Sequence, residues 1–240
     1  DLAGIVTSLN GDFNPRRLER YLALTRESGA KPVFLLTKLD LADAETVRRA
    51  MEQTRALAPD CPILCLSART GEGMDALRAM LSPGVTAVLL GSSGVGKSSL
   101  INALLGRDAM ATGEIRARDG RGRHTTVHRQ MLELACDAML IDTPGMRPLA
   151  MWDAADGIRD AFAEVAEAAQ RCRFRDCTHT HEPGCAVRAG LANGTLDPGR
   201  VANYLKLQSE SDRTAILARK RERSKEISKS SRARRRQERR

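Results

Sequence analysis

The chain has 240 residues and carries 39 Lys or Arg against 30 Asp or Glu, so its formal net charge is +9. This length accommodates one domain of average size and a smaller module. No apolar run is long enough to span a bilayer, so we predict no membrane partner, and an aromatic content of 3% implies a core built mostly from aliphatic side chains.

The first part of the chain alternates between strand and helix patterns. Residues 4–9 predict a strand, residues 15–28 an amphipathic helix, and residues 33–36 a second strand that is followed by TKLD. Parallel sheets bind ligands beyond the carboxyl ends of their strands. A carboxylate at Asp40 can accept from the ring N–H and the exocyclic amine of guanine, a pair of donors that adenine lacks. The predicted base-binding residues are Thr37, Lys38, Leu39 and Asp40.

A further predicted strand, which also ends in a small polar loop, supports this interpretation. Residues 42–58 predict a helix, and the apolar run 62–66 ends in Ser67 and Ala68, which we also assign to the nucleotide. Alone, TKLD is equally well explained as a turn whose acidic residue caps the following helix. Paired with SA after the next strand, it favours a guanine site. A short helix is expected at residues 74–81.

The strand predicted at residues 85–90 leads into GSSGVGKS, which matches G-x-x-x-x-G-K-[ST] at every fixed position. The glycines let backbone N–H groups turn inward around phosphate oxygens. Lys97 is predicted to reach the β- and γ-phosphates in catalysis, and Ser98 to ligate Mg²⁺. A helix at residues 99–105 adds a favourable dipole at its N-terminus. The predicted phosphate-binding residues are Gly91, Ser92, Ser93, Gly94, Val95, Gly96, Lys97, Ser98 and Ser99.

Two further motifs complete a nucleotide switch. Residues 139–145, MLIDTPG, predict a strand that ends in Asp142, placed to hold Mg²⁺ through water and to act in catalysis, with Gly145 able to sense a γ-phosphate. The glycine-rich segment 120–126, GRGRHTT, offers Thr126 as a third magnesium ligand while the γ-phosphate is present.

The water-orienting group departs from the usual pattern. A standard GTPase carries Gln directly after DxxG, whereas this chain has Met146, whose thioether cannot orient water. The nearest catalytic candidate is His124, because an imidazole can orient water near neutral pH. The alternative is that His124 contacts only RNA or solvent.

The order of these motifs is rearranged. The usual GTPase order is phosphate loop, threonine loop, DxxG, [NT]KxD and SA, but here TKLD and SA come first. We therefore predict an α/β fold, a circularly permuted P-loop GTPase domain over residues 1–150, followed by a small α-helical zinc-binding domain over residues 151–218. Residues 219–240, with 12 basic and 3 acidic side chains, predict a disordered tail that binds RNA phosphates.

The zinc prediction rests on residues 172–185, CRFRDCTHTHEPGC. Three thiolates and one imidazole make a closed tetrahedral set for one structural zinc. Disulfides are the weaker interpretation, because a nucleotide switch implies the reducing cytoplasm. His181 is an alternative imidazole that spacing does not exclude. The predicted ligands are Cys172, Cys177, His179 and Cys185.

The series TKLD, SA, GSSGVGKSS, GRGRHTT and DTPG, followed by the Cys/His segment, resembles the family of ribosome small-subunit-dependent GTPases A (RsgA). The resemblance covers nearly the whole chain, including SLNGDFNPRRLERYL at residues 8–22. It implies late maturation of the 30S subunit with ribosome-stimulated GTP hydrolysis, contact with 16S rRNA, and binding of GTP and GDP by a monomer. It also implies an OB-fold before the GTPase domain, which we expect truncation to have removed.

A second function class competes with a GTPase switch. In it, the chain is a zinc-dependent RNA-binding module whose nucleotide is mainly structural. Lys97, Ser98 and Asp142 favour hydrolysis, because binding alone would not need the magnesium machinery. An ATPase or small-molecule kinase is disfavoured by TKLD.

Overall fold

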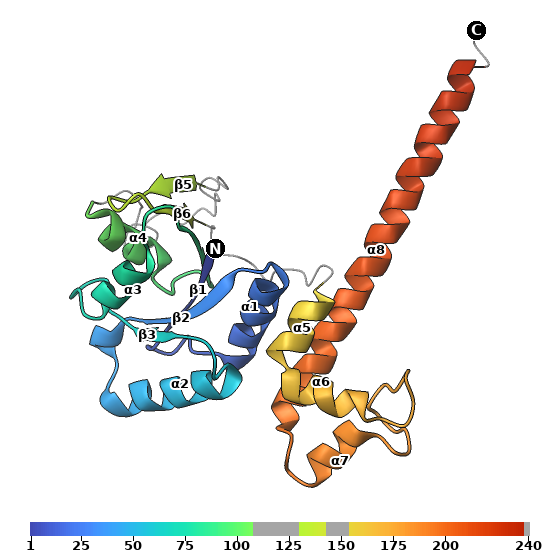
Figure 1. The fold of residues 1–240 in the computed structure, drawn as a ribbon, viewed down its shortest axis with the longest axis horizontal. Coiled ribbons are helices and arrows are strands. Elements are labelled where there is room, and N and C mark those ends of the chain that lie inside the picture. Colours follow the sequence, from blue (N-terminus) through green and yellow to red (C-terminus); the bar gives the residue numbers. More distant parts are fainter. Residues whose placement is uncertain (108–129, 143–153, 238–240) are drawn as a thin grey trace, which may run out of the picture. The chain divides into compact units, whose positions relative to one another are not determined.

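The computed structural model describes residues 1–107, 130–142 and 154–237 (Figure 1). The chain divides into two compact units, Asp1–Leu149 and Ala150–Arg240. Among the described residues, none of the helices combines the length and the apolar character that crossing a membrane requires.

The first unit is built on a six-stranded sheet with the order β3-β2-β1-β4-β6-β5. All neighbouring strands are parallel except β5 and β6, which pair antiparallel. The central strand β1 is buried along its whole length, as expected for a parallel sheet that is covered on both faces. The strands are β1 (Leu2–Ser8), β2 (Lys31–Thr37), β3 (Ile63–Cys65), β4 (Thr86–Leu90), β5 (Gln130–Glu133) and β6 (Met139–Asp142).

Helices cover the two faces of this sheet (Figure 1). Leu35 packs in one cluster with apolar side chains of α3 and α4, whereas the next residue, Leu36, packs with Ala50 of α2 on the other face. This alternation follows from the two-residue period of a strand. Asn14 and Asp43 cap the helices that follow them through their side chains. The helices are α1 (Pro15–Glu27), η1 (Leu39–Leu41), α2 (Ala44–Leu57), α3 (Met74–Met80) and α4 (Lys97–Leu105).

The second unit is helical, and its core is small. The Phe162 and Tyr204 rings meet edge to face with centroids 5.8 Å apart, and the Arg200 guanidinium lies 4.9 Å from the centre of the Phe162 ring. The alanine-rich sequence of residues 158–171 predicts a single helix. This prediction is wrong, because the backbone leaves the helical region at Phe162, with φ −126° and ψ 45°. The helices are α5 (Ala155–Ala161), α6 (Ala163–Gln170), α7 (Ala186–Ala192) and α8 (Pro198–Gln237).

The end of the chain also differs from the sequence-based expectation. Disorder is predicted from residue 219, but α8 continues to Gln237 and extends well beyond the other helices of its unit (Figure 1). The sequence has neither Gly nor Pro after Gly199, and Lys, Arg, Glu and Ala all have high helix propensity. The helix therefore meets no residue that would end it.

Candidate functional site

The phosphate loop joins β4 to α4 and depends on its glycines. Gly94 and Gly96 have φ of 83° and 98°, a region that favours glycine, and Gly96 stands at the N-terminus of α4. At Gly91 a side chain is excluded by packing, because a Cβ would lie 2.6 Å from the carbonyl oxygen of Val6 in β1. The loop is thus seated directly on the neighbouring strand.

Lys97 and Asp142 meet beside this loop. The Lys97 ammonium donates to the carbonyl oxygens of Gly91 and Ser92, both at 2.7 Å, and the residue is only 7% exposed. Asp142 is buried at the end of β6, paired in register with Leu89 of β4. Burial raises the pKa of Asp142, and the positive charge of Lys97 acts in the opposite direction. The cation and the carboxylate therefore lie close enough to influence each other electrostatically, where β4 and β6 end.

The TKLD segment is tied to the phosphate loop through Thr37. Its hydroxyl oxygen lies 2.5 Å from the carbonyl oxygen of Val95 and 3.1 Å from that of Thr7. Lys38 adopts a left-handed backbone conformation, with φ of 60°, which turns the chain at the end of β2. The TKLD segment and the phosphate loop are thus joined by one buried threonine.

TKLD and SA also meet each other. The Ser67 hydroxyl donates to one carboxylate oxygen of Asp40 at 2.6 Å, and the Arg69 Nε donates to the other at 2.8 Å. These bonds, chiefly the one from Ser67, hold the pKa of Asp40 below its usual value. Asp40 is therefore an oriented carboxylate, as a reader of guanine must be. Its partner Arg69 was missed at the sequence level, although it directly follows SA.

The remaining nucleotide-site predictions divide into two groups. Ser93, Ser98 and Ser99 lie in the described loop and the first turn of α4. His124, Thr126 and Gly145 lie outside the described residues, so the water-orienting and γ-phosphate-sensing assignments stay predictions.

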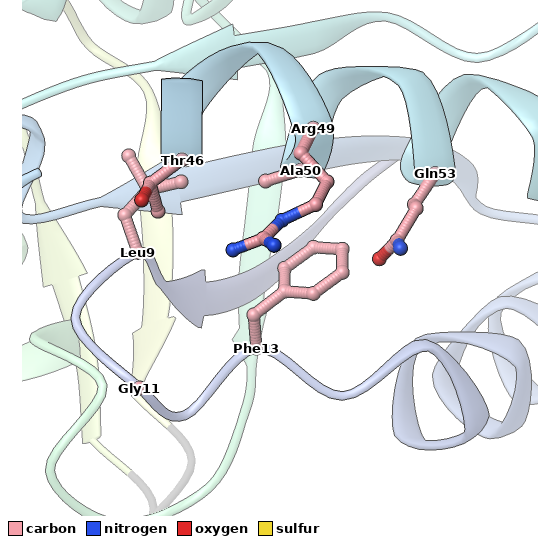
Figure 2. A pocket seen from close by; sticks show the side chains of 7 residues that line it. All are labelled: Leu9, Gly11, Phe13, Thr46, Arg49, Ala50 and Gln53. Atoms are coloured by element: carbon pink, nitrogen blue, oxygen red, sulfur yellow. The ribbon is translucent and has the colours of Figure 1, made fainter. Parts of the chain in front are cut away.

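A cavity of about 450 Å³ lies close to this region, between the segment after β1 and helix α2 (Figure 2). Leu9 and Phe13 form its apolar part, and Arg49 and Gln53 of α2 reach over it. None of the predicted nucleotide-binding residues lines it.

The Cys/His cluster of the second unit brings all four predicted ligands together. Cys172, Cys177, His179 and Cys185 offer ligand atoms that lie within 4.8 Å of one another. His179 Nδ1 is 3.5 Å from the sulfurs of both Cys172 and Cys185, which are 3.9 Å apart. Two thiolates bound tetrahedrally at about 2.3 Å from zinc would be about 3.8 Å apart. All six cysteines of the chain are free, and this cluster fits a zinc site.

Between the two candidate imidazoles, the structure favours His179. Burial lowers the pKa of His179, against the opposite effect of the Glu182 carboxylate, and so favours the neutral imidazole that binds metals. His181 is exposed, with its Nδ1 2.8 Å from the Thr180 hydroxyl oxygen.

Glu182 organises the loop that carries the cluster, a role that the sequence alone did not indicate. Its carboxylate accepts from the backbone N–H groups of Thr178, Thr180 and His181 at 2.9 to 3.1 Å, and from the Thr178 hydroxyl. These bonds, the Thr178 hydroxyl first, hold its pKa far below the usual range. The turn between Cys177 and His179 is therefore fixed by a carboxylate that is not itself a ligand.

Comparison with known proteins shows which family has a similar sequence. The model of a family described as RsgA GTPase matches residues 1–152. A protein of Opitutus terrae named small ribosomal subunit biogenesis GTPase RsgA is 49% identical over 98% of this chain and 66% of its own length. A protein of the same name from Xylella fastidiosa strain M23 is 51% identical over 88% of this chain and 63% of its own length. The chain thus spans less than two thirds of the length of these curated relatives.

Solved structures give the same picture of the fold. YjeQ from Thermotoga maritima matches with a TM-score of 0.61 and 27% identity, over 86% of this chain and 69% of that one. YloQ, described as a circularly permuted GTPase, matches with a TM-score of 0.60 and 22% identity, over 89% of this chain and 69% of that one. The permuted fold predicted from motif order is confirmed.

Proposed function

The chain belongs to the RsgA GTPase family, and from this premise we propose that it binds and hydrolyses GTP while it assists maturation of the small ribosomal subunit. The observation that carries the proposal is the convergence of three sequence-distant motifs at one edge of the sheet. Thr37 connects TKLD to the phosphate loop, and Ser67 connects SA to Asp40. Such a site can hold the base and the phosphates of one nucleotide.

Guanine selectivity is assigned to Asp40. Its two oxygens are oriented by Ser67 and Arg69, so that the carboxylate can accept from the two N–H donors on the guanine edge. Adenine has no such pair of donors, so the carboxylate oxygens would lose these hydrogen bonds. A polar site discriminates against a ligand that leaves its groups unpaired.

Magnesium and the attacking water complete the reaction. Ser98 and Asp142 would hold Mg²⁺ with Thr126, and Lys97 would neutralise charge that develops on the transferred phosphate. When bound, Mg²⁺ would supply positive charge that stabilises the negative charge of the phosphate oxygens. His124 would orient the water in place of the missing Gln, and Gly145 would sense the γ-phosphate.

The Cys/His cluster would hold one structural zinc through Cys172, Cys177, His179 and Cys185. The proposal is supported by the free thiols, the sulfur separations and the closed donor set, which leaves no open position for substrate. Zinc would fix the loop between α6 and α7.

The 30S subunit and its 16S rRNA are the proposed macromolecular partners, in the cytoplasm, with the chain acting as a monomer. The matched relatives are named as biogenesis factors of the small ribosomal subunit, and residues 219–240 carry 12 basic side chains against 3 acidic ones. Removal of this segment is expected to weaken subunit binding and to flatten its dependence on salt concentration.

Substitution of Asp40 tests the nucleotide assignment. Asp40→Asn is expected to weaken GTP binding at least about tenfold and to improve binding of xanthosine triphosphate, because the amide now offers a donor. Asp43→Asn is the matched control, since Asp43 caps α2 through Thr46 and Asn caps equally well. Titrations of both variants with GTP, ATP and xanthosine triphosphate measure the effect. Unchanged GTP affinity in Asp40→Asn would refute the assignment.

A further inference from the structure

Two side chains that were not assigned to the nucleotide site, Asp12 and Arg17, form a closed set of hydrogen bonds with Ser92 of the phosphate loop. Arg17 Nη1 donates to both carboxylate oxygens of Asp12, at 2.9 and 2.8 Å, and to the Ser92 hydroxyl at 2.7 Å. The Ser92 hydroxyl in turn donates to Asp12 at 2.8 Å. We call Asp12 and Arg17 the outer clamp. It joins the connection between β1 and α1 to a loop residue that is 75 to 80 positions away in sequence.

The clamp acts on a residue that is also held from inside the loop. The Ser92 carbonyl accepts from the Lys97 ammonium at 2.7 Å, while its side chain is turned to the clamp. Three residues later, Val95 is held by Thr37. The loop is thus fixed at its second residue by the outer clamp and at its fifth by TKLD.

The clamp itself rests on ordered structure. Arg17 stands in the first turn of α1, whose N-terminus is capped by Asn14. The backbone carbonyl of Asp12 accepts from the Thr7 hydroxyl of β1 at 3.3 Å. The neighbouring Phe13 packs with Leu9 against the cluster that includes Ala50 of α2, beside the cavity shown in Figure 2. Phe13 therefore anchors the segment on one side while Asp12 faces the loop on the other.

We infer that Asp12 and Arg17 are positioning residues for the phosphate loop: they hold Ser92 so that the loop N–H groups are already arranged for the phosphates before the nucleotide arrives. A loop that is ordered in advance loses less conformational entropy on binding, which raises affinity without adding a contact to the ligand. The inference rests on the proposed GTP binding. It assigns part of that affinity to residues that act only through Ser92.

A double-mutant cycle between Arg17 and Ser92 tests the clamp. Arg17→Ala is expected to weaken binding of a non-hydrolysable GTP analogue about tenfold, and Ser92→Ala a few-fold. The double variant should bind no more weakly than Arg17→Ala, because the two residues act through one set of bonds. In steady-state assays of Arg17→Ala, the KM for GTP should rise while kcat stays within about twofold of that of the unmodified chain. This pattern is expected when a mutation removes binding energy that the ground state and the transition state share. Arg17→Lys, which keeps the positive charge and a donor group, should recover part of the affinity.

Arg26 provides the matched control on the same helix. Arg26 lies in the last turn of α1, and its guanidinium donates to both carboxylate oxygens of Asp60 at 2.9 Å. Arg26→Ala therefore removes a similar ion pair and should leave GTP affinity unchanged. Thermal unfolding without nucleotide should shift alike in Arg17→Ala and Arg26→Ala.

The outcomes separate the clamp from the proposed function. GTP affinity retained in both Arg17→Ala and Ser92→Ala, with normal binding by the unmodified chain, would overturn the clamp alone. Additive losses in the double variant would also overturn it. If Arg17→Ala does not fold, Ser92→Ala, which removes a single oxygen, decides the question. An unmodified chain that binds no GTP would overturn the clamp and the proposed function together.

Discussion

The phosphate loop packs against the apolar core of the first unit, whereas the loop that carries the Cys/His cluster buries almost no apolar side chain. Val95 of the phosphate loop and Leu100 and Ile101 of the following helix belong to the main apolar cluster of the first unit. By contrast, no residue from 173 to 184, a segment that the structure describes in full, is buried. Hydrophobic burial is the main source of folding energy. The nucleotide site is therefore shaped by its fold, whereas the loop of the cluster fits the proposal that a bound zinc holds it.

Removal of zinc should produce the largest effect and confine it to one unit. Zinc in small structural sites contributes about 10 kcal/mol or more to folding, so Cys172→Ser or a strong chelator should unfold the segment between α6 and α7. GTP affinity, which depends on the first unit, should be retained. Metal analysis and nucleotide titration of the same sample measure both quantities.

Cys136→Ser is the control for this experiment, since Cys136 is an exposed free thiol outside the cluster. It should keep about one zinc per chain. Full zinc in Cys172→Ser would contradict the ligand assignment.

Lys97→Ala should have the opposite effect: GTP binding should be lost while both units stay folded. The variant removes a charged donor to the phosphates and should weaken GTP binding about a hundredfold. Because the loop stays seated on β1 at Gly91, the far-ultraviolet circular dichroism and the zinc content should not change. Collapse of the first unit in this variant would show that the loop depends on its lysine rather than on the sheet.

Glu182→Gln tests whether hydrogen bonds help the metal to shape the cluster loop. The amide keeps the side-chain shape but removes the charge that accepts from Thr178, Thr180 and His181. Partners of this kind typically change metal affinity by a factor of about 10 to 100, and we expect the lower figure, since the amide oxygen still accepts. Competition with a zinc chelator measures it. Unaltered zinc affinity would mean that the four ligands suffice.

Thr37→Val should have the smallest effect. It keeps the volume of the side chain but removes the hydroxyl that contacts Val95 and Thr7. The buried carbonyl of Val95 would lose a partner, at a cost of about 1 kcal/mol in unfolding free energy, with a few-fold loss of GTP affinity. Chemical denaturation and nucleotide titration measure the two changes. A hundredfold loss of affinity with unchanged stability would assign Thr37 a direct contact with the base instead.

Motifs that are continuous in sequence could be predicted, because their spacing alone determines their chemistry. GSSGVGKS, TKLD and the Cys/His segment are of this kind, and the order of the first two was enough to identify the permuted sheet. The four cluster residues are brought together as predicted.

The features that were missed depend on contacts between distant segments or on competing local tendencies. Strand β5, QMLE, is short and mixed in polarity, and it is defined by its pairing with β6. The break at Phe162 follows from its packing with Tyr204 and Arg200. Asp12, Arg17 and Ser92 are ordinary residue types whose association exists only in the folded sheet.

Turnover of GTP by the purified chain, with and without small ribosomal subunits, tests the proposed function most directly. We expect slow hydrolysis by the chain alone, because Met146 occupies the place of the water-orienting Gln, and a clear increase when 30S subunits are added. Lys97→Ala should abolish both rates, and His124→Ala should keep GTP binding while losing most of the increase. Turnover that never exceeds that of Lys97→Ala, with subunits present or absent, would contradict the proposal and leave an RNA-binding module whose nucleotide is structural.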